Sequence, residues 1–269
     1  MKSDVKKILI ILVILLNVYI WHVVLEFYFL KPSVNFLNVF EGDSALIVSR
    51  AGNFLIDAGR KNYVLKPLTS SLPFFEKTID VVLISHADSD HFEGLNFVLD
   101  NYKVRVVILN DLENDNESYQ KLLNKILDKN IKIVLGVKGA KVKTVDLAIS
   151  CLYPSKDKLF LKKTNEKSEI LLINDLNKRW LFTGDITDKI LKGVVESEKL
   201  INIDVLKVPH HGGKNTINAD ILALLNVKQA IISVGSNNYG HPNGDIIKML
   251  ESIGAKVLRT DIEGNIKME

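Results

Sequence analysis

The stretch DVVLISHADSDH, residues 80–91, joins a row of apolar residues to a dense group of polar ones. The unbroken apolar row at 81–84 is typical of a strand that is buried on both faces of a sheet. Four side chains able to bind a metal follow it directly, namely His86, Asp88, Asp90 and His91. A tight loop at a strand end lets such side chains converge on one point. Since imidazole nitrogen and carboxylate oxygen suit zinc, manganese or iron, this stretch predicts a metal site.

A polar loop that only caps the following helix is the alternative, with Asp88 or Asp90 as the capping residue. Aspartate is common in that role, but two flanking histidines are not needed for it. The chain has six histidines and a single cysteine, so a cysteine-based zinc cluster is excluded and metal chemistry must use His, Asp and Glu. We therefore prefer the metal site.

The rest of the body alternates between short apolar runs and turn residues, and its last third alternates strand with helix. With 47% hydrophobic and 25% charged residues, the composition is that of a folded globular protein and excludes a disordered one. We predict one α/β domain. Strands are predicted at 34–39, 44–48, 53–56, 80–85, 104–109, 131–135, 144–152, 170–174, 180–182, 205–208, 229–234 and 255–258, and helices at 92–99, 118–127, 219–225 and 245–253.

One short sequence pattern occurs twice. An Ile-Asp-Val triplet begins at Ile79 and again at Ile203, and a histidine follows each at the same interval, His86 and His210 respectively. A duplicated half-domain that aims both histidines into one cleft explains the match.

These motifs resemble those of the metallo-β-lactamase superfamily. The loop at His86 is similar to the metal-binding loop of that superfamily, with Asp88 where most members have a second histidine. LFTGD at 181–185 resembles the strand that supplies a bridging aspartate, and VPHHGG at 208–213 the segment that supplies a late histidine. The resemblance is strongest to the hydrolase domain of ComEC-type competence proteins and their stand-alone relatives, which share VFEGDS at 39–44 and YGHP at 239–242. It implies a metallo-β-lactamase αββα sandwich.

The resemblance also implies two divalent metal ions, zinc or manganese. Asp185 would bridge the two ions, and no histidine occurs at 164–169, where many members supply another ligand to the first ion. The first site would therefore be weaker and richer in oxygen. The expected metal ligands are His86, Asp88, Asp90, His91, Asp185 and His210.

Catalytic and substrate roles follow from this arrangement. Because His210 matches His86 in its interval, we expect His210 to be the ligand and His211 to face the substrate. His211 would protonate a leaving group, or alternatively orient a ligand by a hydrogen bond. Asp90 and His211 are the expected catalytic residues, Asp43 and Asp57 are expected to orient ligands, and Asn165, Ser168, Lys214 and His241 are expected to contact substrate, with turn capping as the alternative for His241.

The apolar run at 8–25 predicts a membrane anchor. Continued to Leu30, a helix would reach about 34 Å, enough for a hydrocarbon core of about 30 Å. A cleaved signal peptide and a buried core helix are the alternatives, but the run has no Ala-x-Ala cleavage pattern and residues 8–16 show no polar face. We expect residues 1–32 to form a leader and anchor and residues 33–269 the hydrolase domain.

Charge gives the expected orientation. Lys2, Lys6 and Lys7 precede the apolar run, and Lys31 alone follows it closely, so the positive-inside rule predicts a cytoplasmic N-terminus and an extracytoplasmic domain. Most of the formal net charge of +3 lies in residues 1–32, which leaves the body nearly neutral. Any surface for a polyanion must therefore be local.

The resemblance implies hydrolysis of phosphodiesters by a metal-activated water, with DNA as the first choice of substrate. One span cannot conduct DNA, so the chain would degrade nucleic acid outside the cytoplasm or serve a separate DNA-uptake channel. Hydrolysis of cell-envelope phosphodiesters or another small ester is the alternative, followed by a non-catalytic binding module with a decayed site. No oligomeric state is indicated. Lysines expected to frame the cleft, or merely to solubilise loops, are Lys162, Lys163, Lys167, Lys207 and Lys214.

Overall fold

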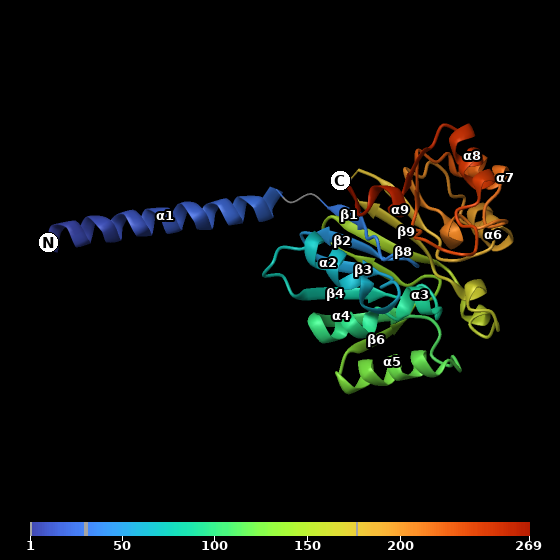
Figure 1. Cartoon of the computed structure of the whole chain (residues 1–269), viewed down its shortest axis with the longest axis horizontal. Coiled ribbons are helices and arrows are strands. Elements are labelled where there is room, and N and C mark those ends of the chain that lie inside the picture. Colours follow the sequence, from blue (N-terminus) through green and yellow to red (C-terminus); the bar gives the residue numbers. More distant parts are fainter. Residues whose placement is uncertain (1, 30–31, 176) are drawn as a thin grey trace.

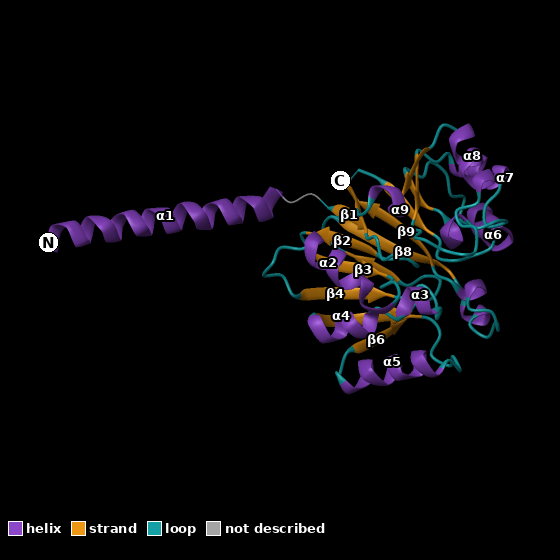
Figure 2. Cartoon of the chain, in the orientation of Figure 1, coloured by secondary structure: helices purple, strands orange, loops and turns teal. Residues whose placement is uncertain are grey.

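The computed structural model describes residues 2–29, 32–175 and 177–269. Two seven-stranded sheets face each other, and helices cover the outer face of each sheet (Figures 1 and 2). The predicted αββα sandwich is confirmed. The first sheet contains, in spatial order, β14 (Ile266–Met268), β1 (Ser33–Phe36), β2 (Ala45–Ser49), β3 (Gly52–Ile56), β4 (Thr78–Leu83), β5 (Lys103–Leu109) and β6 (Lys132–Leu135). The second contains β13 (Lys256–Arg259), β12 (Gln229–Ile232), β11 (Val205–Lys207), β10 (Arg179–Phe182), β9 (Ile170–Asp175), β8 (Leu147–Tyr153) and β7 (Lys141–Lys143).

Successive side chains in each strand point to opposite faces of the sheet, and both faces pack against a hydrophobic core. In β2, Leu46 packs outward against the helices, whereas Ala45 and Ile47 pack between the sheets. Phe36 and Phe182 stack across the two sheets with ring centroids 5.5 Å apart. The helices beside the first sheet are α2 (Leu65–Ser71), α3 (Ser89–Phe92), α4 (Leu95–Asn101) and α5 (Glu117–Asp128), and the other helices of the body are α6 (Asp188–Ser197), α7 (Ala219–Leu225), α8 (Gly244–Ser252) and α9 (Thr260–Glu263). The 3₁₀ helices among the described residues are η1 (Lys61–Val64), η2 (Lys156–Lys158), η3 (Asn165–Lys167) and η4 (Pro209–Gly212).

The repeated Ile-Asp-Val pattern has the same structural role in both sheets. The Asp80 carboxylate accepts a hydrogen bond from the backbone N–H of Asn53 at 2.9 Å. The Asp204 carboxylate accepts one from the N–H of Arg179 at 2.8 Å. Each aspartate thus accepts a hydrogen bond from a backbone N–H at the start of a neighbouring parallel strand, β3 for Asp80 and β10 for Asp204. This equivalence supports a duplicated half-domain.

The N-terminal helix α1 (Lys2–Phe29) extends away from the sandwich (Figure 1). Its window Asp4–Leu25 has a mean hydropathy of 2.7, and none of it is buried against the rest of the chain. A core helix would be buried, so this segment is a candidate membrane span. The expected helix end at Leu30 and the charge at Lys31 lie outside the described residues.

Candidate metal centre

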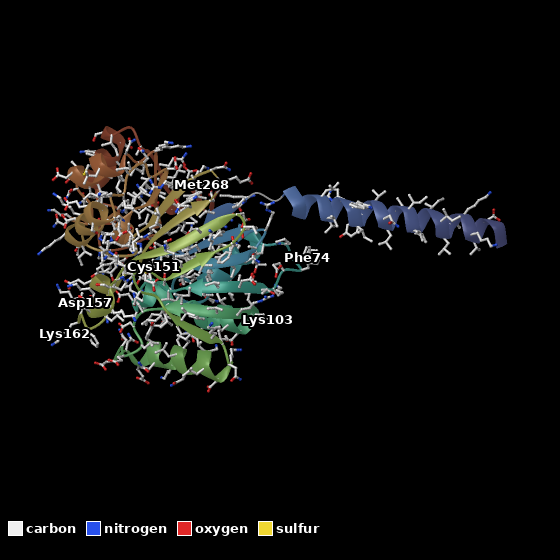
Figure 3. The ribbon with its side chains drawn as sticks, turned by 180° about the vertical axis from the view of Figure 1, so that it is seen from behind. Phe74, Lys103, Cys151, Asp157, Lys162 and Met268 are labelled. Atoms are coloured by element: carbon white, nitrogen blue, oxygen red, sulfur yellow. The ribbon has the colours of Figure 1, made fainter. Side chains whose placement is uncertain are left out.

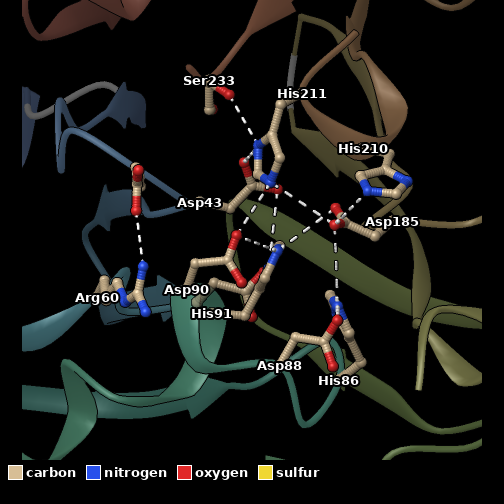
Figure 4. Close-up of polar contacts among 12 residues, drawn as sticks. Asp43, Arg60, His86, Asp88, Asp90, His91, Asp185, His210, His211 and Ser233 are labelled. Carbon is tan, nitrogen blue, oxygen red and sulfur yellow. Dashed lines mark hydrogen bonds and ion pairs between the residues drawn. The ribbon is translucent and has the colours of Figure 1, made fainter. Parts of the chain in front are cut away.

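The polar groups predicted to bind metal meet where β4, β10 and β11 end, at one edge of the sandwich (Figure 4). His86 follows β4, and Asp90 and His91 lie in the short helix α3 just beyond it. Asp185 follows β10, and the two adjacent histidines lie in η4 after β11. Because carboxyl ends of parallel strands meet at one edge, residues far apart in the sequence converge there.

The arrangement fits divalent cations. The Nε2 atoms of His86, His91 and His211 and the Oδ1 atom of Asp185 are buried without a hydrogen bond in the described part of the chain. Buried polar atoms are rarely left unpaired, so their shared direction indicates a ligand. The atoms of each group lie within 4.8 Å of one another, in the sets His86–His91–Asp185 and Asp90–His91–His211.

Each of these histidines is held through its other nitrogen. Nδ1 of His91 lies 2.9 Å from the Asp57 carboxylate, and Nδ1 of His211 lies 2.9 Å from the Ser233 carbonyl oxygen. Nδ1 of His86 lies 3.0 Å from the Ser85 hydroxyl, which itself donates to Asp57. An Nδ1–H group bound in this way leaves Nε2 as the lone-pair donor to a metal. The expectation that Asp57 orients a ligand agrees with this geometry.

The two adjacent histidines take the opposite positions from those expected. Nε2 of His211 lies 3.3 Å from Asp90 and 3.6 Å from Asp185, and the residue is buried. His210 lies 3.8 Å from Asp185, at the side of the cluster, and its side chain is 38% exposed. The two strands end at the same distance from their histidines, but His210 and His211 both adopt left-handed backbone conformations, with φ of 49° and 53°, and this turn breaks the equivalence. This turn points His211 inward and His210 toward the cavity.

Two carboxylates and one imidazole lie together at the candidate first metal position. Nε2 of His86 lies 3.5 Å from Asp88 and 4.0 Å from Asp185. The outer oxygen of Asp88 accepts a short hydrogen bond from the Thr164 hydroxyl. Sequence patterns did not single out Thr164, because a lone threonine in a loop carries no metal-binding signal.

The residues expected to contact substrate divide into two groups. His241 lines a cavity of about 490 Å³ over the metal ligands, and Asn165 lines an adjoining cleft of about 450 Å³. Ser168 is fully buried and accepts a hydrogen bond from the Asp185 backbone N–H at 3.2 Å, so it positions the aspartate instead. Lys214 is exposed and lines neither space.

Other cavity residues were not predicted. Arg60 and Tyr239 line the main cavity, and Arg60 is held by Glu41 at 2.8 Å. Arg60 directly follows Gly59, and nothing in its neighbours separates it from a surface arginine. Only the fold brings Arg60 beside Asp90. The hydrogen bond that Arg60 donates to Glu41 raises the pKa of Arg60, and the charge of Asp90 adds a smaller contribution.

Charge is tightly balanced within the cluster. Burial alone disfavours the ionised forms, but His91 and His211 hold the pKa of Asp185 well below its usual value. Against burial, Asp185 and Asp43 raise the pKa of His211 to about 10, and Asp185 and Asp57 raise that of His91. Without metal, both imidazoles are therefore cations near neutral pH.

We expect metal binding to release about two protons at pH 7.5, one each from His91 and His211, because a metal ligand must be a neutral imidazole. Apparent affinity should then fall by about tenfold per proton for each unit of pH lowered. Calorimetric titration with Zn²⁺ or Mn²⁺ in buffers of different ionisation enthalpy measures the number directly. Binding without proton release would contradict the raised pKa values.

Comparison with known proteins places these features in context. A family model described as the metallo-beta-lactamase superfamily matches residues 37–135. The chain is 28% identical over 256 residues to ComE operon protein 3 of Bacillus subtilis and 25% identical over 246 residues to Recombination protein 2 of Haemophilus influenzae. Each match covers 88% of this chain but 33% and 29% of the relative, so the chain spans about a third of their length. The metallo-beta-lactamase fold protein YhfI from Bacillus subtilis superposes with a TM-score of 0.60 at 15% identity, over 88% of this chain and 100% of YhfI, and shows the shared fold.

Proposed function

We propose that this chain is a metal-dependent hydrolase of the metallo-β-lactamase superfamily that cleaves phosphodiester bonds, with DNA as its substrate. The observation that carries the proposal is the set of unpaired, converging ligand atoms beneath an open cavity. The competence-related relatives support DNA as substrate. The proposal includes an N-in anchor at 1–32, an extracytoplasmic domain at 33–269 and a separate DNA-uptake channel as a partner.

In this proposal His86, Asp88 and Asp185 hold one ion, and Asp90, His91 and His211 hold the other. Both zinc and manganese suit these ligands. Two such ions activate water and neutralise charge on a phosphodiester. Asp185 lies between the two groups, with one oxygen 3.4 Å from His91 and the other 4.0 Å from His86.

His210 takes the substrate-facing role that the sequence suggested for its neighbour. It lines both the main cavity and the adjoining cleft. Burial lowers its pKa, and the nearby cations His211 and Lys207 lower it further, against the opposing charge of Asp185. A neutral His210 imidazole can hydrogen-bond to a phosphate oxygen or to the leaving group.

The loop at 154–165 supports a polyanionic substrate. Lys162 and Lys163 are exposed and line the cleft that contains His210 and Asp185. Phe160, in the same loop, is 81% exposed, as suits stacking on a base. Two lysines that we expected to frame the cleft do not contribute, because Lys167 and Lys207 are buried in ion pairs with Asp111 and Asp43.

Replacing Lys162 and Lys163 together by alanine should weaken binding of single-stranded DNA. The slope of log binding constant against log salt concentration should also become shallower, by about 0.7 for each phosphate that is no longer neutralised. Turnover of a small phosphodiester should fall much less than DNA binding, since a small substrate offers few phosphates for these lysines to neutralise. Filter binding over a salt series measures the slope. The matched control replaces Lys121 and Lys129, which are exposed near or on the outer helix α5. Equal losses in the two variants would contradict a role for the loop.

The proposed reaction is tested with the full chain in detergent, loaded with Zn²⁺ or Mn²⁺. Cleavage of DNA that is lost with a chelator and restored by metal is the expected result. Cleavage of small phosphodiesters alone would instead favour cell-envelope substrates. Failure to bind metal at all would leave only a non-catalytic binding role.

A further inference from the structure

Two adjacent phenylalanines project from the loop between α2 and β4. Phe74 is 86% exposed and Phe75 is 70% exposed. Their rings contact each other edge to face with centroids 5.4 Å apart, so they form one apolar point on the surface. Packing within the domain does not account for them, and a paired exposed aromatic surface is typical of an interaction site.

The topology puts this pair at the same edge of the first sheet as the anchor. Strand β1 runs antiparallel to β2, β2 runs antiparallel to β3, and β3 runs parallel to β4. Strands β1 and β4 are therefore parallel, and their N-terminal ends lie at one edge. Helix α1 leads toward the start of β1, and the phenylalanine loop leads into the start of β4. Three strand spacings separate the two starts, about 14 Å.

Three exposed lysines lie along the same edge of the sheet as the aromatic pair. Lys77 precedes β4, Lys103 begins β5 and Lys132 begins β6, and all three are exposed. Because β4, β5 and β6 are parallel, these lysines lie along the same edge. The backbone N–H of Lys103 donates to the Lys77 carbonyl oxygen at 2.7 Å, which fixes the two residues side by side.

Nearby acidic groups are engaged elsewhere. Asp80 lies 3.3 Å from the Arg105 guanidinium. The Glu76 carboxylate accepts a hydrogen bond from the Thr78 backbone N–H at 2.7 Å. Asp80 is thus compensated by Arg105, and the remaining charge of Glu76 offsets that of the three lysines only in part.

We propose that Phe74, Phe75, Lys77, Lys103 and Lys132 form a second contact with the membrane that holds α1, and we call them the membrane-facing edge. Aromatic side chains enter the headgroup region, and lysines attract anionic lipid headgroups. The proposal rests on α1 being a membrane anchor. Figure 3 shows Phe74 and Lys103 on the side of the body toward α1, with Lys162 and Asp157 on the opposite side.

The membrane-facing edge fixes which way the metal centre opens. The ligands follow the carboxyl ends of the strands, whereas the phenylalanine loop precedes β4, a strand of about 20 Å at this length. The cavity is then held away from the lipid and opens to the aqueous side. Such an orientation suits a dissolved polymer better than a phospholipid headgroup in the same bilayer.

The test uses the full chain in vesicles of phosphatidylcholine and phosphatidylglycerol with a fraction of nitroxide-labelled lipid. Single variants Phe74→Cys, Phe160→Cys and Leu12→Cys are labelled with a fluorescent dye. Cys151 is the only native cysteine; it is buried and its pKa is raised by burial, so it does not react. Lipid quenching at 12 and 74 but not at 160 is the expected result. Phe160 is a matched control because it is equally exposed but lies in the loop beside the metal centre.

If the dye at position 12 is quenched but the dye at position 74 fluoresces as strongly as the dye at position 160, the membrane-facing edge is overturned and the anchor is not. No quenching at either 12 or 74 would overturn both. The charge contribution is tested by replacing Lys77, Lys103 and Lys132 with glutamine in the Phe74→Cys chain, which should reduce quenching at 74. Glutamine at Lys189, Lys192 and Lys248, exposed or partly exposed lysines of α6 and α8, should leave it unchanged.

Discussion

Replacing His211 by alanine should remove the second metal ion and lower turnover by more than about 10²-fold. Removing even a residue that only hydrogen-bonds to a metal ligand typically lowers metal affinity or activity by about 10- to 100-fold. His211 is the only residue of the η4 turn whose Nε2 is buried, unpaired and within 3.3 Å of Asp90. Its loss leaves Asp90 and His91 as the remaining side chains of that set. Elemental analysis of the purified chain and turnover of a small phosphodiester measure the two effects together.

The adjacent His210→Ala variant is the matched control. Its metal content should stay near that of the native chain, because His210 stands at the side of the ligand cluster with its side chain 38% exposed. If its imidazole transfers a proton, turnover should fall by about 10²–10⁴-fold, and the loss should shrink for substrates with good leaving groups. Metal lost from the His210 variant and kept in the His211 variant would restore the assignment that the sequence interval suggested.

The difference between these histidines shows what a sequence interval can predict. The repeated Ile-Asp-Val pattern correctly indicated equivalent strands, because Asp80 and Asp204 cap neighbouring strands in the same way. It did not predict the direction of side chains beyond the strand. That direction depends on the left-handed conformations after Pro209, which have no signature at either histidine.

Strong local patterns were predicted well and weak ones were not. The long buried strands and the helices α4, α5, α7 and α8 were found, with boundaries differing by a few residues. The three-residue edge strands β7 and β14 were missed, since so short a segment carries no periodicity. Helix α6 was also missed, although Leu191, Val194 and Val195 form its buried face. The buried lysines were misjudged because their partners lie far away in the sequence.

Replacing the buried Lys207 by methionine should lower the free energy of unfolding by about 3–5 kcal/mol, the usual effect of leaving one member of a buried pair uncompensated. Lys207 is only 3% exposed and contacts the Asp43 carboxylate, whose other oxygen lies 3.3 Å from Nδ1 of His211. Thermal unfolding of the metal-free chain should show a midpoint lower by roughly 10 °C. The control Lys228→Met removes the exposed partner of Asp204 and should change stability by less than about 1 kcal/mol.

The pH dependence of this stability difference should show that the charge of Asp43 causes it. Burial raises its pKa, but Lys207 and His211 together lower it to about 2. The stability from this carboxylate is therefore present above its unfolded pKa of about 3.9 and is lost as the pH falls toward 2. The difference between the native chain and Lys207→Met should shrink over the same range. A difference that stays constant from pH 6 to pH 2 would mean that lost packing, and not the charge of Asp43, explains the effect.

A double variant, Asp43→Asn with Lys207→Met, separates stability from function. Removing both charges eliminates the uncompensated carboxylate, so most of the lost stability should return, as it does when buried pairs are replaced together. Turnover should be low, because asparagine at position 43 no longer places a negative charge 3.3 Å from Nδ1 of His211. Recovery of stability and turnover together would show that Asp43 matters only as the partner of Lys207.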